Sequence, residues 1–292
     1  MMTIVRLTLL EALRRRLLWA LVGLTIAVVL LTGWGVALLV ANARSRALAE
    51  PQIELGVSQV VILLAFMYSF VLAMTAAFLG APALAADVES GIAQTMLARP
   101  LRRSELVVGR WVGLALIIVG YATIGGGLEL VAVRVVSGYV PPGPVAAIIY
   151  LAAQAILLLT VALLLSARQP AMAGGAIAVV LFGLSWIAGV LGGIASVLGL
   201  GDLQLLTDGA RLLVPLDGLW RGVVFHLEPQ AALLLLGLAG PAGGTAGSAA
   251  TAASANPFFA AAPPAMAYVI WAAAWVAIVL GAAIALFRRR EL

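Results

Sequence analysis

Side chains with reactive chemistry are scarce in this chain of 292 residues. It contains no cysteine and a single histidine, His226. It therefore has no disulfide, no thiolate metal site and no cysteine nucleophile, and one histidine cannot build a histidine-based metal cage. All 17 basic residues are arginine, so the lysine that a Walker A loop places on nucleotide phosphates is missing. We expect no ATP site of that type, no cofactor and no metal on this chain.

The densest group of polar residues lies between positions 87 and 105, in the sequence DVESGIAQTMLARPLRRSE. Glu89 lies in the first turn of a short predicted helix, where the helix dipole favours negative charge. Pro100 should end this helix, because the residue before a proline avoids the helical conformation. On a helical wheel Glu89 falls within an apolar half. It could pair with a nearby arginine on a face that packs on protein, or it could be a solvated first-turn residue.

Two further polar side chains, Glu129 and Gln154, interrupt long apolar runs. If these runs cross a membrane, a carboxylate inside one is a functional candidate by default. Glu129 lies within about two turns of the outer end of its run and could reach the interface or Arg134, so we favour a structural role for it. Gln154 is expected to form a hydrogen bond between helices rather than to bind a substrate.

The chain is too apolar to have water as the solvent for most of its surface. Hydrophobic residues make up 64% and charged residues 10%, against roughly 25% charged in soluble proteins. Six runs are long enough to cross an apolar core that needs about 20 helical residues. These runs are 17–41, 57–86, 106–136, 144–166, 172–200 and 265–287. We expect an all-α integral membrane protein with six transmembrane helices, in one domain over residues 1–292, and a polar loop at 42–56.

Other segments are predicted to lie outside the spans. Residues 1–16 have apolar side chains at helical spacing, which is typical of an interfacial helix. Residues 202–230 alternate charged and apolar side chains and predict amphipathic helices at the outer surface. Residues 239–264 are rich in glycine, alanine, serine and proline, which indicates a disordered low-complexity external linker.

The arginines set the expected orientation. Twelve of the 17 lie on the side of both chain ends and of segment 87–105. By the positive-inside rule this side is the cytoplasm. The twelve are Arg6, Arg14, Arg15, Arg16, Arg99, Arg102, Arg103, Arg110, Arg168, Arg288, Arg289 and Arg290, and the outer five are Arg44, Arg46, Arg134, Arg211 and Arg221. We therefore expect an integral protein of a prokaryotic plasma membrane with both termini in the cytoplasm.

Segment 89–110 resembles the loop between spans two and three of type-2 permeases of ATP-binding cassette (ABC) exporters. That loop reads roughly E-x-G-T-x-x-x-L-L-x-x-P-x-x-R-x-x-x-x-x-G-K. The matching positions are Glu89, Gly91, Met96, Leu97, Pro100, Arg103, Gly109 and Arg110. Ile92 stands where threonine is common, and Arg110 replaces lysine with its charge kept. The resemblance covers most of the chain, including the N-terminal helix, the external helices and the basic C-terminal end.

This resemblance implies a function and a set of partners. Segment 87–105 would be the coupling helix that docks on a separate ATP-binding subunit, which would hold the ATP and magnesium. The residues implied in coupling are Glu89, Gly91, Ile92, Met96, Leu97, Pro100 and Arg103. A second permease copy, or a similar chain, would complete the path through the lipid. The chain would be a transport subunit rather than an enzyme, with no role in nucleic-acid binding.

Two other function classes compete with this reading. A secondary transporter usually carries charges near the membrane midplane and often inverted repeats, and neither is evident here. An intramembrane enzyme would have little catalytic equipment without cysteine, lysine or a second histidine. The transported substrate cannot be read from the sequence, since an apolar path would suit a lipid, a hydrophobic drug or a peptide.

Overall fold

The structure is a computed structural model that describes residues 2–14, 16–89, 102–229 and 256–290. All regular secondary structure in these residues is helical. Six helical segments of 23 to 37 residues are long and apolar enough to cross a membrane. They are α2 (Arg16–Ser45), α3 (Glu50–Gly80) with α4 (Pro82–Glu89), α6 (Arg103–Ser137), α7 (Pro144–Ser166), α8 (Ala171–Leu198) and α13 (Met266–Arg288). The prediction of an all-helical integral membrane protein with six candidate spans is confirmed.

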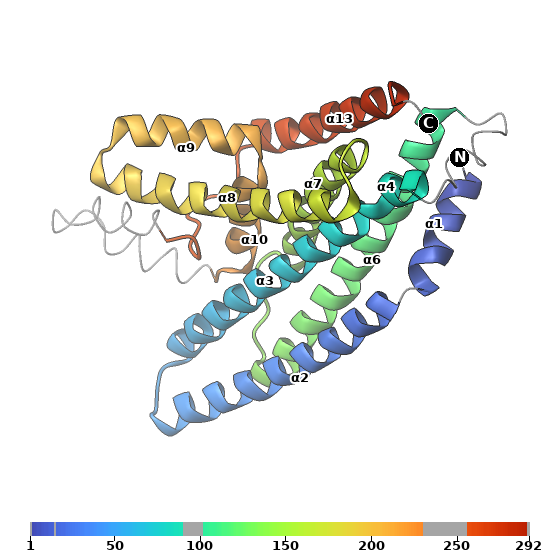
Figure 1. Ribbon diagram of the computed structural model, residues 1–292. Helices are drawn as coiled ribbons and strands as arrows, with labels where there is room; N and C mark the ends of the chain where they lie inside the picture. The colour runs from blue at the N-terminus through green and yellow to red at the C-terminus, as the bar shows by residue number, and fades with distance from the viewer. Residues whose placement is uncertain (1, 15, 90–101, 230–255, 291–292) are drawn as a thin grey trace.

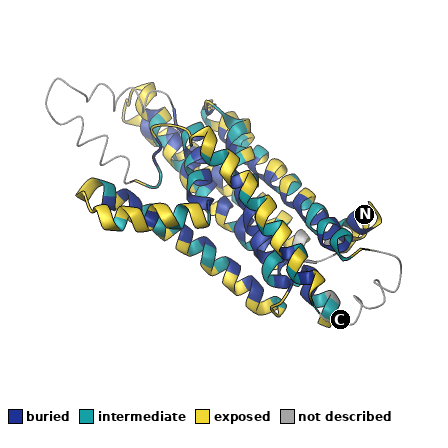
Figure 2. Ribbon diagram, turned by 90° about the horizontal axis from the view of Figure 1, so that it is seen from above, coloured by how far each residue is buried: buried dark blue, intermediate teal, exposed yellow. Residues whose placement is uncertain are grey.

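Helices α3 and α7 form the centre of the bundle. In their most apolar stretches 56% and 61% of residues are buried, against 17% in α13. The two central helices approach closely because Gly80 has no side chain: a Cβ there would meet Ala162 at 2.8 Å. Large apolar side chains on the outer helices, such as Trp34 and Ile270, are exposed. Figure 2 shows exposed positions along the outer faces of the bundle, where lipid replaces water as the solvent.

Two predicted helix boundaries were wrong. The loop expected at 42–56 is mostly helical, because α2 runs to Ser45 and α3 begins at Glu50. Gln52 favours this early start, since its Oε1 accepts a hydrogen bond from the Ala49 N–H at 3.3 Å. The second predicted span, 57–86, is interrupted at Ala81, and Pro82 begins α4. Proline suits a first helical position because its missing N–H would have no partner within the helix.

The described residues of segment 202–230 fold into two helices with different surroundings. Helix α9 (Gly201–Leu213) lies along α8 and buries only Thr207 (Figure 1). Helix α10 (Leu216–Leu227) is mostly buried and contacts α7, α8 and α3. The expectation that this whole segment lies at the surface was therefore wrong for α10. Its apolar face, with Trp220 and Val223 buried, packs on protein rather than on the membrane interface.

The end of the predicted linker is also packed. Residues 256–264 are described, and Phe259 and Ala260 are buried. Phe258 contacts the ring of Phe66 edge to face, and the Ala260 N–H donates to the Glu228 carboxylate at 3.3 Å. The expectation of disorder was wrong for this part of 239–264, because Phe258 packs against the rings of Phe66 and Trp220 in the helix bundle. Residues 230–255 lie outside the described part of the chain.

Helix α1 (Met2–Arg14) packs on the N-terminal part of α6, and not only on a membrane interface as its apolar spacing suggested. Ile4 and Thr8 are buried against α6. Gly109 and Gly113 permit this contact, because a Cβ at either position would meet Ile4 or Thr8 at 2.8 Å. Small residues that let helices approach closely are common in membrane proteins.

Candidate functional site

One end of the molecule gathers α1, α4, the start of α6 and the end of α13 (Figure 1). The two described flanks of segment 87–105, residues 87–89 and 102–105, lie at this end. Of the residues implied in coupling, Glu89 is the last residue of α4 and Arg103 is the first of α6. The others, Gly91, Ile92, Met96, Leu97 and Pro100, lie outside the described residues. The structure therefore shows how the two flanks of this segment are held.

The flank that precedes the segment is fixed by a side chain from another helix. The Ser166 hydroxyl, at the end of α7, accepts hydrogen bonds from the Leu84 N–H at 2.9 Å and the Ala85 N–H at 3.0 Å. These amides lie in the first turn of α4, where backbone donors have no partner within the helix. Ser166 thus caps α4 from a distance of more than 80 residues in sequence. Sequence reasoning missed this role, because nothing near Ser166 signals it.

The flank that follows the segment is fixed to the C-terminal end of the chain. The Arg103 Nη1 donates to the carbonyls of Phe287, Arg288 and Arg290 at 3.5, 3.0 and 2.7 Å. Arg290 in turn donates to the Ala167 carbonyl at 3.0 Å. A guanidinium at a helix C-terminus meets carbonyls that have no partner within the helix and the negative end of the dipole. Arg103 therefore joins the start of α6 to the end of α13.

The first turn of α6 and helix α1 add further contacts at this end. Glu105 accepts a hydrogen bond from the Arg102 N–H at 3.3 Å, which closes the first turn of α6. Arg110, which is buried, pairs with Glu11 of α1 at 2.6 Å. Position 110 was matched to the family pattern, but sequence reasoning did not find its partner Glu11. The charge that the pattern keeps at position 110 thus anchors α1 to α6.

Glu89 lies exposed at the end of α4. Among the described residues it forms no ion pair with Arg102 or Arg103. Arg99, the other arginine near it in sequence, lies outside the described residues. The sequence left two alternatives for Glu89, a pair with an arginine or a solvated carboxylate. Its exposure in the single chain agrees with the solvated carboxylate.

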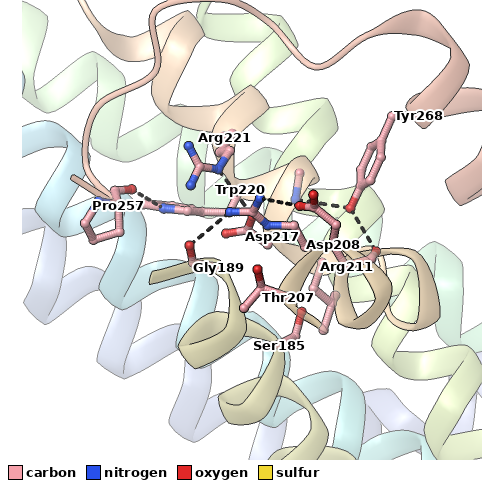
Figure 3. Close-up of polar contacts among 12 residues, drawn as sticks. Ser185, Gly189, Thr207, Asp208, Arg211, Asp217, Trp220, Arg221, Pro257 and Tyr268 are labelled. Atoms are coloured by element: carbon pink, nitrogen blue, oxygen red, sulfur yellow. Dashed lines mark hydrogen bonds and ion pairs between the residues drawn. The ribbon is translucent and has the colours of Figure 1, made fainter. Parts of the chain in front are cut away.

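At the opposite end, charged residues tie α9 and α10 to each other and to α8 (Figure 3). We call Asp208, Arg211, Asp217 and Arg221 the outer cluster. Asp217 is buried, and its Oδ2 lies 2.9 Å from the Arg211 Nε and 3.2 Å from the Arg221 Nε. Arg211 also contacts Asp208 at 3.2 Å and donates to the Gly189 carbonyl of α8 at 3.0 Å. Sequence reasoning saw these residues only as parts of amphipathic helices.

Glycines let the outer cluster form. A Cβ at Gly189 would collide with the Asp217 carboxylate, and one at Gly218 would collide with the Tyr268 ring of α13. The Tyr268 hydroxyl accepts a hydrogen bond from the Gly218 N–H at 3.2 Å and lies 3.4 Å from the Arg211 carbonyl, to which it donates. The C-terminal end of α8 and the N-terminal end of α13 are thus linked through α9 and α10.

The two predicted intramembrane polar residues have different surroundings. Gln154 joins three elements: its Oε1 accepts from the Ser69 hydroxyl of α3 at 2.7 Å, and its Nε2 donates to the Leu216 carbonyl at 3.4 Å. It is an interhelical hydrogen-bonding residue, as its type and position indicated. Glu129 of α6 is buried, and among the described residues its Oε1 has no hydrogen-bond partner.

Comparison with known families gives one match over nearly the whole chain. Residues 2–292 match the family described as ABC-2 family transporter protein. No curated protein matches the chain.

Proposed function

Because the chain belongs to the ABC-2 family of membrane transport proteins, we propose that it is the permease subunit of an ABC exporter, driven by a separate ATP-hydrolysing subunit. ABC permeases generally pair with ATP-binding subunits. The ATP and magnesium would be held by that partner, since this chain has no lysine for a Walker A loop. A second permease copy, or a similar chain, would complete the path across a prokaryotic plasma membrane.

The observation that carries this proposal is that both flanks of segment 87–105 are fastened to membrane helices at one end of the bundle. Ser166 holds the start of α4 on α7, and Arg103 holds the start of α6 on α13. A force applied to the segment by an ATPase subunit would therefore act on four spans instead of being lost in a loose loop. Such coupled movement of packed helices is a known form of switching.

The orientation of this end supports the same reading. The N-terminus, the C-terminus and both flanks of segment 87–105 lie together (Figure 1). If the six spans cross the membrane in turn, twelve of the 17 arginines lie on the side of this end. Arginine-rich loops favour the cytoplasm. Cytoplasmic ATPase subunits would then meet exposed Glu89 and the coupling residues next to it. In the complex, Glu89 would face the ATPase subunit.

The outer cluster would close the opposite end during the cycle. Asp217 is buried between two arginines, and a buried ion pair resists removal of either partner. Opening the outer end would require α9 and α10 to move relative to α8 and α13, which these contacts join. The closed outer end is therefore the resting arrangement in this proposal.

The test uses the permease reconstituted with its ATPase subunit in proteoliposomes. In Glu89→Arg we expect normal insertion, weaker association with the ATPase and at least severalfold lower transport. Glu54→Gln, which removes an exposed carboxylate at the opposite end of α3, should leave transport unchanged. If residues 88–98 can be replaced by an unrelated helix with transport and ATP hydrolysis unchanged, the segment does not couple the two subunits and the proposal fails.

A further inference from the structure

A small polar cluster lies within the membrane-spanning region where α2, α3 and α6 meet. It consists of Thr25, Tyr68, Tyr121 and Glu129. The Glu129 side chain lines two small cavities, the larger against α2 and the smaller against α7, and Tyr68 lines both as well. Neither the family match nor the coupling mechanism gives this cluster a role.

The hydroxyl groups of the cluster are bonded to one another or to the backbone. The Tyr68 hydroxyl donates to the Tyr121 carbonyl at 2.6 Å. The Thr25 and Tyr121 hydroxyls lie 2.7 Å apart, and Thr25 also donates to the Leu21 carbonyl. Gly125 brings Tyr68 close to α6, because a Cβ there would collide with the tyrosine hydroxyl. These contacts hold the two rings, whose centroids are 5.8 Å apart, in the wall of the larger cavity, which Glu129 also lines.

Glu129 is buried with one carboxylate oxygen that forms no hydrogen bond among the described residues. The residue is 6% exposed, and its Oε1 has no hydrogen-bond partner among the described residues. An unpaired polar atom in an apolar environment is costly, and a charged one more so. Arg134, the arginine nearest to it in sequence, is exposed and forms no ion pair with it in the described structure. Among the described residues, no cation pairs with the Glu129 carboxylate.

The larger cavity has the chemistry of a site for an apolar molecule with one positive charge. Its remaining lining is largely aliphatic, including Leu24, Val28, Met67 and Val71. Leu24 and Met67 are also exposed on the bundle surface, so the cavity adjoins the region occupied by lipid. Aromatic faces attract cations, and a carboxylate pairs with them in a low-dielectric setting. A molecule that dissolves in lipid could enter between α2 and α3.

We propose that this cavity binds lipophilic monovalent cations, with the positive charge beside Glu129 and the rings of Tyr68 and Tyr121. This inference rests on the proposed function, because it names the class of molecule that the permease would move. The apolar body of the ligand would lie among the aliphatic side chains. Its positive charge would contact the Glu129 Oε1, which has no hydrogen-bond partner among the described residues.

The test measures binding by the purified chain in lipid nanodiscs, without any ATPase subunit. Radiolabelled tetraphenylphosphonium is the probe, and tetraphenylborate, which has the same shape and the opposite charge, is its matched control. We expect saturable binding of the cation and no competition by the anion. Glu129→Gln should weaken cation binding about ten- to hundredfold, the usual size of an interaction with a charged group. Glu54→Gln, which removes an exposed carboxylate of α3, should change nothing.

Two further variants keep the test decisive if Glu129→Gln does not fold. Glu129→Asp keeps the charge and should retain most of the binding. Tyr121→Leu removes one ring and should weaken binding about two- to thirtyfold. Unchanged cation binding in a folded Glu129→Gln protein, or equal binding of the anion, would overturn the proposal. Since no ATPase subunit is present, that result would leave the coupling proposal standing, and failed coupling would leave the binding result standing.

Discussion

Removal of the Ser166 hydroxyl should loosen the helix that leads into the coupling segment. Ser166 and Leu84 are 0% exposed and Ala85 is 1% exposed, so water cannot replace the lost acceptor. In Ser166→Ala the N–H groups of Leu84 and Ala85 would both lose their partner. A buried donor without a partner costs about 1–3 kcal/mol, and loss of a helix cap costs about 0.5–2 kcal/mol. We expect α4 to be destabilised by about 2–3 kcal/mol.

Amide hydrogen exchange measures this effect directly. Every 1.4 kcal/mol changes an equilibrium tenfold, so the amides of residues 83–89 should exchange about 30- to 150-fold faster in Ser166→Ala. Ser45→Ala is the control, because the Ser45 hydroxyl is exposed and donates only to the nearby Asn42 carbonyl. Transport by Ser166→Ala should fall although the coupling residues are intact. Unchanged exchange in 83–89, or an equal increase in every helix, would refute the argument that Ser166 acts locally on α4.

Two other predictions concern the outer end. In Gly189→Ala the new Cβ would displace the Asp217 carboxylate, so we expect the free energy of unfolding to fall by about 1–3 kcal/mol and the melting temperature to fall with it. Gly183→Ala on the same helix is the control, because no atom lies near the Cβ it would add, and it should melt like the wild type. Equal melting temperatures of the two variants would contradict the packing argument. Burial raises the pKa of the Glu228 carboxyl from 4.5 to about 7, against the opposing hydrogen bond from Ala260. The folded state then binds a proton more tightly than the unfolded state, so stability should fall as pH rises from about 4.5 to 7. Thermal unfolding between pH 4 and pH 8 should show this fall in stability in the wild type and in the control Asp202→Asn, which changes an exposed residue. A fall of the same size in Glu228→Gln would show that other groups cause the pH dependence.

The amino-acid sequence by itself determined the class of protein and the number of spans. Apolar runs longer than a membrane crossing leave helices as the available structure, because lipid offers the backbone no hydrogen bonds. The absence of lysine and cysteine excluded a Walker A site and thiolate chemistry. The pattern around Glu89, Pro100 and Arg103 also pointed to the right family. These conclusions depend on composition and local spacing, which a linear sequence contains.

Contacts between distant residues were decided only by the tertiary structure. Ser166 caps α4, Glu11 pairs with Arg110, and Arg211 pairs with Asp217, and no local pattern marks any of these partners. Helix α10 was assigned to the surface because its charges alternate with apolar residues, yet Asp217 is buried there by its arginine partners. Glu129 was given a structural role because Arg134 was near in sequence, but α2 and α3 enclose it in apolar walls. Whether a charge is solvated, paired or left unsatisfied depends on which helices surround it, and only the packing of the bundle determines that.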